Sequence, residues 1–114
     1  MWDRARPHDR REALFGGRGA VRVWDAGSAA LPRPFAVALA CELDPSGCVG
    51  THVQEHHPEV VIGVEGRGVA TVDGAPHPLE PGAVVPLALG RKLAIENGSA
   101  TDPLRYLIIK AGGR

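Results

Sequence analysis

The run GTHVQEHHPEVVIGVEG, residues 50–66, decides the fold because its polar side chains alternate as they do in β-strands. Successive side chains of a strand point to opposite faces, so His52, Gln54 and His56 are predicted to share one face. Pro58 cannot donate a hydrogen bond to a neighbouring strand and marks a bend. The run therefore predicts two strands joined at a bend, with three polar groups gathered on one side.

The strand after this bend combines an acidic side chain with a glycine. Glu59 is predicted to share a face with Val61 and Gly63, again by alternation. Because Gly63 has no side chain, we expect room beside Glu59 for an ion or a ligand.

Outside this run, many short apolar segments are separated by turn residues. The chain contains 15 Gly and 10 Pro, and the segments between them are rich in Val, Ile, Leu and Ala. This pattern is typical of an all-β sandwich or barrel. Helix is expected only as a short turn near residues 9–15. The predicted strands are residues 20–25, 35–43, 48–54, 59–65, 68–73, 83–87, 92–96 and 104–110.

Three turns are predicted from residue type. Asp73-Gly74 is a pair preferred in two-residue hairpin turns, so residues 59–80 are expected to form a chain of hairpins. Residues 79–82, Leu-Glu-Pro-Gly, supply a second turn, in which Pro81 suits the second turn position and Gly82 the third. Residues 97–99 supply the third turn.

Size and charge limit the classes of function. A chain of 114 residues is predicted to form one domain. Its 13 basic and 13 acidic residues give a formal net charge of zero, which does not favour nucleic acid as a partner. No apolar run is long enough to span a membrane, and residues 1–18 lack the apolar stretch of a signal peptide. A cytoplasmic location is expected.

The two cysteines flank a turn at residues 44–47. Counting outward from that turn places Cys48 opposite Leu43 and Cys41 opposite Gly50, which is out of register for a cross-strand disulfide. Free thiols are therefore expected.

Residues 50–66 resemble the first motif of the cupin superfamily, in which His-x-His is followed by Glu and then Gly. His52, Glu59 and Gly66 match this motif, and Gln54 stands where the second His normally stands. The resemblance implies an all-β double-stranded β-helix, a jelly-roll-like antiparallel barrel. It also implies a divalent metal ion held by His52, Gln54 and Glu59.

The second cupin motif is matched only approximately, by Pro86, Gly90 and Asn97. Depending on the alignment, Leu93 or Arg91 stands where the family has a metal-binding His, and neither is an ordinary ligand. Residues 103–109 resemble the last strand of the family. The resemblance covers about residues 35–110 and divides the chain into an N-terminal arm, 1–18, and one barrel, 19–114.

Because the second motif lacks its metal-binding His, two interpretations of the site remain open. In the first interpretation a metal is bound, but His52 and Glu59 supply only one imidazole and one carboxylate. Catalytic zinc and iron sites use three strong protein ligands. His56 could add a third ligand if the strand bulges. Alternatively, the barrel binds no metal, and His52 and Gln54 hydrogen-bond a ligand, water or each other. Leu93 and Ile95 would then form an apolar wall, suited to a small organic molecule with a carboxylate, hydroxyl or carbonyl group.

Several other residues are given structural interpretations. At least one of His56 and His57 is expected in solvent, and His77 is expected on the surface. Trp24 and Tyr106 suit either the pocket or the core. The apolar residues 60–64 suit the core or a dimer face, and a homodimer is expected. The arm is expected to be disordered or to add a strand to a neighbouring subunit.

Three classes of function follow. The first is a metal-dependent enzyme acting on a small polar metabolite, as an isomerase, lyase or oxygenase. The second is a metal-free small-molecule binding module, and the third is a structural subunit without a ligand of its own.

Overall fold

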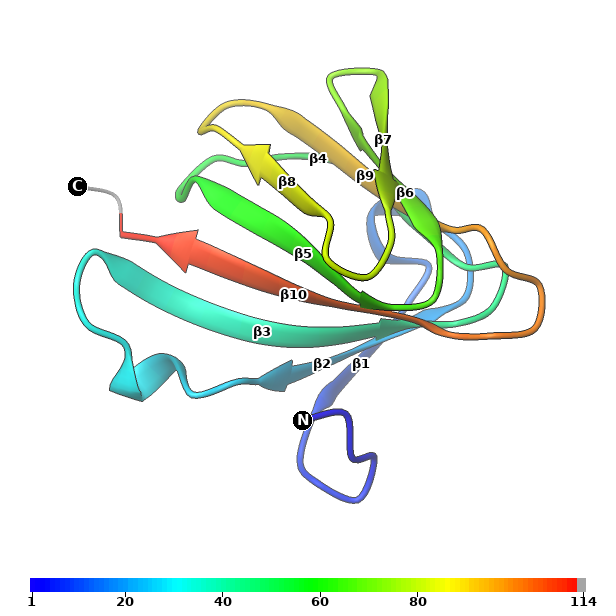
Figure 1. Cartoon of the computed structure of the whole chain (residues 1–114), viewed down its shortest axis with the longest axis horizontal. Helices are drawn as coiled ribbons and strands as arrows, with labels where there is room; N and C mark the ends of the chain where they lie inside the picture. The colour runs from blue at the N-terminus through cyan, green and yellow to red at the C-terminus, as the bar shows by residue number, and fades with distance from the viewer. Residues whose placement is uncertain (113–114) are drawn as a thin grey trace.

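Two antiparallel β-sheets face each other in the computed structural model, which describes residues 1–112 (Figure 1). The six-stranded sheet has the order β1 (Asp9–Glu12), β2 (Ala20–Asp25), β3 (Phe35–Leu43), β10 (Leu104–Ala111), β5 (Glu59–Glu65), β8 (Val84–Leu87). The four-stranded sheet has the order β4 (Cys48–Val53), β9 (Lys92–Asn97), β6 (Gly68–Val72), β7 (Ala75–Leu79). Short 3-10 turns lie at η1 (Leu14–Gly16) and η2 (Ser28–Ala30).

The predicted all-β class is confirmed, and each of the predicted strands is present with ends shifted by at most one residue. Two strands were not predicted. Residues 9–12 form β1 rather than part of a helical turn, and they pair with β2 at the sheet edge. Because all four residues of β1 are exposed and charged, the segment has no apolar alternation that would identify a strand.

The other unpredicted strand, β7, contains two prolines. Pro76 and Pro78 lie opposite Thr71 and Val69 of β6. β7 is the edge of its sheet, where a residue without an N–H is tolerated because no further strand needs its hydrogen bond. The two prolines argued against a strand in the sequence, although a strand at a sheet edge tolerates them.

The turns at residues 73–74 and 79–82 are confirmed, but the predicted turn at 97–99 is wrong, because Asn97 ends β9 and residues 98–99 form no turn. The predicted chain of hairpins is also wrong. Asp73 and Gly74 have φ of 50° and 83°, as a two-residue hairpin between β6 and β7 requires. β5 and β6, however, belong to different sheets. The chain crosses between the sheets at Gly66, whose φ is +88° and where an added Cβ would lie 2.6 Å from the carbonyl oxygen of Pro103.

The same kind of crossing separates the cysteines. β3 carries Cys41 in the six-stranded sheet and β4 carries Cys48 in the four-stranded sheet. The predicted register across the 44–47 turn is therefore wrong, since these strands do not pair. The predicted free thiols are confirmed.

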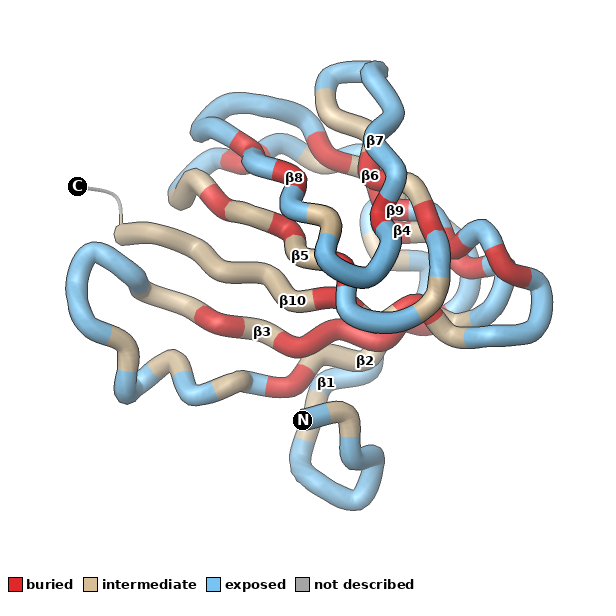
Figure 2. The backbone as a smooth tube through the Cα atoms, viewed as in Figure 1, coloured by how far each residue is buried: buried red, intermediate tan, exposed pale blue. Residues whose placement is uncertain are grey.

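The core lies between the two sheets, and Figure 2 shows the buried positions along the strands. Its side chains come from the inner faces of both sheets, so each sheet covers the inner face of the other. Fully buried members include Leu43, Val61, Leu79, Leu87, Leu93, Leu104 and Tyr106.

The N-terminal arm packs on this chain's own six-stranded sheet. The indole Nε1 of Trp2 donates to the carbonyl oxygen of Cys41 at 2.9 Å, and that of Trp24 donates to the carbonyl oxygen of Asp3 at 2.9 Å. Arg4 also donates to the buried carboxylate of Glu42 at 2.7 Å. The arm is thus ordered on its own chain, and its strand β1 extends the six-stranded sheet. Pairing of the arm with a neighbouring subunit stays a prediction.

Glu42 is a buried anion held between two guanidinium groups. Arg105 donates to its second oxygen at 2.9 Å, opposite Arg4. Burial alone would raise the pKa of Glu42, but the hydrogen bonds from Arg4 and Arg105 outweigh it and lower that pKa. The arm therefore supplies, through Arg4, one of the two partners of the buried Glu42 carboxylate.

Across residues 1–112, no helix is long and apolar enough to cross a membrane.

Candidate functional site

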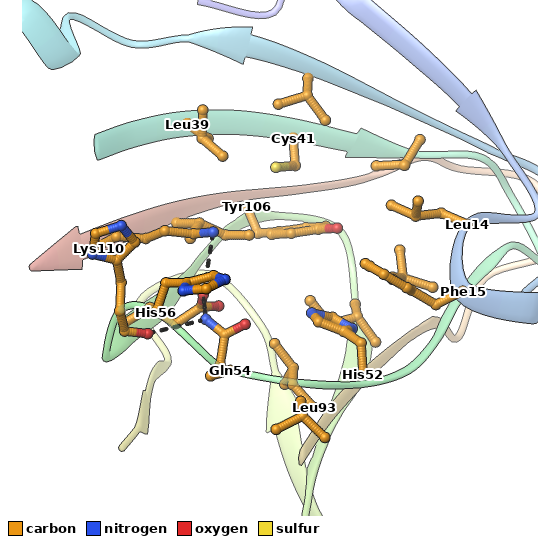
Figure 3. A pocket seen from close by; sticks show the side chains of 18 of the residues that line it. Leu14, Phe15, Leu39, Cys41, His52, Gln54, His56, Leu93, Tyr106 and Lys110 are labelled. Carbon is orange, nitrogen blue, oxygen red and sulfur yellow. Dashed lines mark hydrogen bonds and ion pairs between the residues drawn. The ribbon is translucent and has the colours of Figure 1, made fainter. Parts of the chain in front are cut away.

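A cavity of about 330 Å³ lies between the two sheets, at the size of a small-ligand pocket (Figure 3). Its wall is mainly apolar, contributed by both sheets and by η1. The aliphatic lining residues are Leu14, Val21, Val23, Leu39, Val49, Val53, Leu93, Ile95 and Ile108. A ligand inside would therefore meet mainly apolar side chains.

One end of the cavity is polar. Gln54 follows β4, Glu59 begins β5, and Lys110 lies near the end of β10, so three segments bring these side chains together. The amide Nε2 of Gln54 donates to Oε1 of Glu59. The Lys110 Nζ lies 4.0 Å from the same oxygen. Figure 3 shows Lys110, Gln54 and His56 at this end of the pocket.

Glu59 is the least usual group in the cavity. It is only 5% exposed, and its Oε2 is buried without a hydrogen-bond partner among the described residues. Burial raises the pKa of Glu59 to about 7, although the charge of Lys110 and the hydrogen bond from Gln54 both act to lower it. A buried polar atom without a partner marks a place for a ligand's hydrogen bond.

His52 lies at the other end of the cavity. Its ring is stacked on that of Phe15, with centroids 4.2 Å apart and planes at 15°. Its Nδ1 is 3.2 Å from the carbonyl oxygen of Gly50. Burial lowers the pKa of His52, which favours a neutral ring. His52 is thus packed against an aromatic ring as well as facing the pocket.

Three further histidines, His56, His57 and His77, lie in different surroundings. His56 is exposed and lines the cavity, as do His52 and Gln54. Val53 and Glu55 line it too, so the predicted alternation of faces is wrong here, because β4 ends at Val53 and the chain is irregular from Gln54 to Pro58. The Nδ1 of His57 is 2.8 Å from the carbonyl oxygen of Ala111, a contact that ties the bend to β10. His77 is exposed on β7, as expected.

The predicted apolar wall is confirmed. Leu93 is 1% exposed and lines the cavity together with Ile95. It lies directly opposite His52 in the pairing of β4 with β9. Tyr106 also lines the cavity, whereas Trp24 reaches the arm through its indole nitrogen.

The space predicted beside Gly63 is filled by the chain itself. An added Cβ at Gly63 would lie 2.1 Å from the carbonyl oxygen of Glu80. Gly63 also donates to the carbonyl oxygen of Ala83 at 2.9 Å and accepts from Gly82 at 2.9 Å. This glycine therefore admits the 80–83 turn, and the prediction of room for an ion or ligand there is wrong.

Two parts of the site were missed from the sequence. Lys110 shares a face with Tyr106 and Ile108 by alternation along β10, and this signal could have found it. Leu14 and Phe15 come from the turn before β2, where no periodic pattern points toward a pocket.

The donor set fits a resident divalent metal poorly. Among residues 1–112, no three His, Cys, Asp or Glu side chains are grouped closely enough to hold a metal ion. Gln54 turns its amide nitrogen toward Glu59, and the Lys110 ammonium already lies beside that carboxylate. Leu93 adds no ligand. The metal roles of His52, Gln54 and Glu59 stay a prediction from the resemblance.

Comparison with family models and with curated proteins finds no match. Solved structures do match. One is a protein from Thermotoga maritima named a predicted oxalate decarboxylase, with a TM-score of 0.81 and 24% identity over 92% of this chain and 91% of that one. Another is a Cupin 2 conserved barrel domain protein from Salinispora arenicola, with a TM-score of 0.71 and 23% identity over 96% and 84% of the two chains.

A third similar structure is a sugar phosphate isomerase of the cupin superfamily from Silicibacter pomeroyi. Its TM-score is 0.68 and its identity 20%, over 91% of this chain and 71% of that one. At these identities the likeness establishes the fold and not the activity. The chain has the cupin fold, as the resemblance in residues 50–66 predicts.

Proposed function

We propose that this cupin-fold protein binds a small hydroxy acid with an apolar body. The side chains of the protein, and not a metal ion, would hold this ligand. The observation that carries the proposal is the Glu59–Lys110 pair at one end of a cavity lined mainly by apolar side chains. The named relatives support small polar molecules as the ligands of such barrels, since two carry the names of a decarboxylase and a sugar phosphate isomerase.

The polar end has complementary groups for such a ligand. The Lys110 ammonium offers N–H donors and a positive charge to a carboxylate. The unpartnered Oε2 of Glu59 offers an acceptor to a hydroxyl on the neighbouring carbon. A hydroxy acid satisfies both groups, whereas a plain acid leaves the Glu59 oxygen without a donor.

The rest of the cavity favours an apolar body. Burial of each methylene group contributes about 0.8 kcal/mol, or roughly a fourfold change in affinity. The aliphatic side chains from both sheets, with Leu93 fully buried among them, offer such burial. Small sugars, which carry a hydroxyl on nearly every carbon, would leave several hydroxyls against this wall without partners.

A proton-transfer reaction on the bound acid is the second candidate, of the isomerase or lyase type. It is favoured by Glu59, whose pKa of about 7 is suited to a general acid or base near neutral pH. Exchange of ligand carbon-bound hydrogen in deuterium oxide, followed by NMR and lost in Glu59→Gln, would support this candidate. Binding without exchange would leave a binding module.

Isothermal titration calorimetry with 2-hydroxyhexanoate, hexanoate and 1-hexanol tests the binding proposal. We expect affinity to fall in that order. Lys110→Met should weaken 2-hydroxyhexanoate at least tenfold, since a charge-assisted hydrogen bond is lost. The matched control is Lys92→Met, at the other lysine of the chain, which is exposed and outside the cavity. Failure of all three compounds to bind, or equal losses in both variants, would overturn the proposal.

Metal content separates this proposal from the metal-dependent alternative. Inductively coupled plasma mass spectrometry should be applied to untagged protein purified without chelator, beside His52→Ala. Our proposal expects substoichiometric metal and ligand binding that survives chelator. Stoichiometric metal that His52→Ala removes would instead support the metal site predicted at His52, Gln54 and Glu59.

A further inference from the structure

We propose that the turn at residues 13–17 sets the length of the ligand, because Leu14 and Phe15 close the end of the pocket opposite Glu59 and Lys110. This inference rests on the proposed function and adds the residues that determine specificity. Both side chains line the cavity. Figure 3 shows them across the pocket from Lys110 and Gln54.

Phe15 is held at this end in an unusual backbone conformation. Its φ is +54°, and Ala13 before it has φ of +48°, the left-handed region that side chains with a Cβ rarely adopt. Phe15 is nevertheless 55% exposed as a residue. A strained turn that presents a large apolar ring to solvent gains little from burial, and such strain is common at functional sites.

The turn is fixed to β4 by direct backbone contact. An added Cβ at Gly17 would lie 1.9 Å from the carbonyl oxygen of Cys48, and one at Gly50 would lie 1.9 Å from that of Phe15. Arg18 and Cys48 exchange two backbone hydrogen bonds, of 2.9 and 2.8 Å. These contacts leave little freedom for the backbone of the turn to move away from the pocket.

Stacking on His52 fixes the ring as well as the backbone. The two rings are nearly parallel, and His52 itself lines the cavity from β4. A ligand tail extending from the Glu59–Lys110 end therefore meets a wall whose position is set by the protein. Each methylene should add affinity until the tail reaches Phe15, and further methylenes should weaken binding because they overpack the end.

A chain-length series of 2-hydroxy acids, from butanoate to dodecanoate, measured by calorimetry, tests this role. In the unaltered protein we expect affinity to rise about fourfold per methylene to an optimum and then fall. Phe15→Ala should move the optimum to longer acids by at least two carbons. Leu14→Ala should act in the same direction, as a second variant at the same wall.

Phe35→Ala is the matched control. Phe35 is the other phenylalanine of the chain, is similarly exposed at 48%, and does not line this cavity. Its optimum should be that of the unaltered protein. An unchanged optimum in both Phe15→Ala and Leu14→Ala, with binding retained, would overturn the length-setting role alone. Absence of binding throughout the series in the unaltered protein would overturn the proposed function itself.

Discussion

Glu59 makes the stability of the fold depend on pH. Its pKa rises from 4.5 to about 7 on folding, chiefly because of burial, so the folded chain holds this proton more tightly than the unfolded chain. Its favourable contribution is complete below pH 4.5 and is lost as pH rises toward 7. At about 1.36 kcal/mol per pKa unit, the loss is on the order of 3 kcal/mol above pH 7.

Glu59→Gln should remove this dependence, because the amide resembles the protonated acid and does not ionise. We expect the variant and the unaltered protein to have similar free energies of unfolding near pH 4. At pH 8 the variant should be more stable by about 2 to 3 kcal/mol. Urea unfolding at pH 4, 6 and 8 measures this, and parallel pH profiles for the two proteins would contradict it.

Gly63 shows how one position links two elements of the fold. β5 and the 80–83 turn approach so closely there that no side chain fits between them, and the strand and turn exchange backbone hydrogen bonds. Gly63→Ala should cost at least about 2 kcal/mol, since the obstacle is backbone that cannot rotate away. Gly74→Ala lies at a hairpin tip with open space around it, although its positive φ carries a smaller cost.

Thermal unfolding of the two alanine variants compares these costs. The midpoint of Gly63→Ala should fall well below that of Gly74→Ala. The opposite order would mean that the close approach at Gly63 relaxes more easily than the conformation at Gly74.

Apart from β1 and β7, the strands were predictable from the sequence because each is a short segment between turn residues. Richness in apolar residues identified β3, β5 and β10, and Asp73-Gly74 identified the turn that follows β6. Which strands share a sheet was not predictable in the same way. The turns after β3 and β5 resemble hairpin turns, yet both carry the chain from one sheet to the other. Sheet membership depends on packing between distant segments, which local residue types do not report.

The candidate site was predicted in part for a similar reason. His52, Gln54 and Glu59 lie within residues 50–66, so one motif brings them to notice, and all three line the cavity. Lys110 follows Glu59 by 51 positions in the chain and reaches it only through the pairing of β10 with β5, where the two residues are opposite each other. A partner fixed by sheet register is visible only once the register is known.

The N-terminal arm covers only part of the outer face of the six-stranded sheet. Residues 1–8 lie over the β2 and β3 side, through Trp2, Arg4 and Trp24. On the β5 and β8 side, Val64 and Val84 are 37% and 58% exposed. We expect the predicted homodimer to use this uncovered apolar side, because exposed apolar surface of this kind favours association.

Size-exclusion chromatography with light scattering checks the dimer. The unaltered protein should elute with twice the chain mass of 12.0 kDa, and Val84→Glu should give monomer while leaving the fold intact by circular dichroism. A monomer for the unaltered protein at micromolar concentration, or a dimer that Val84→Glu leaves unchanged, would exclude this face as the interface.

Lys110 has a consequence for how the pocket acquires its positive charge. The charge beside Glu59 belongs to a side chain of β10, so it is made when the chain is made. Every folded copy carries one, without a loading step and without competition among ions of the medium. If the pocket binds the proposed hydroxy acid, its affinity for that anion would not depend on the supply of metal ions, and its occupancy would follow the supply of the acid alone.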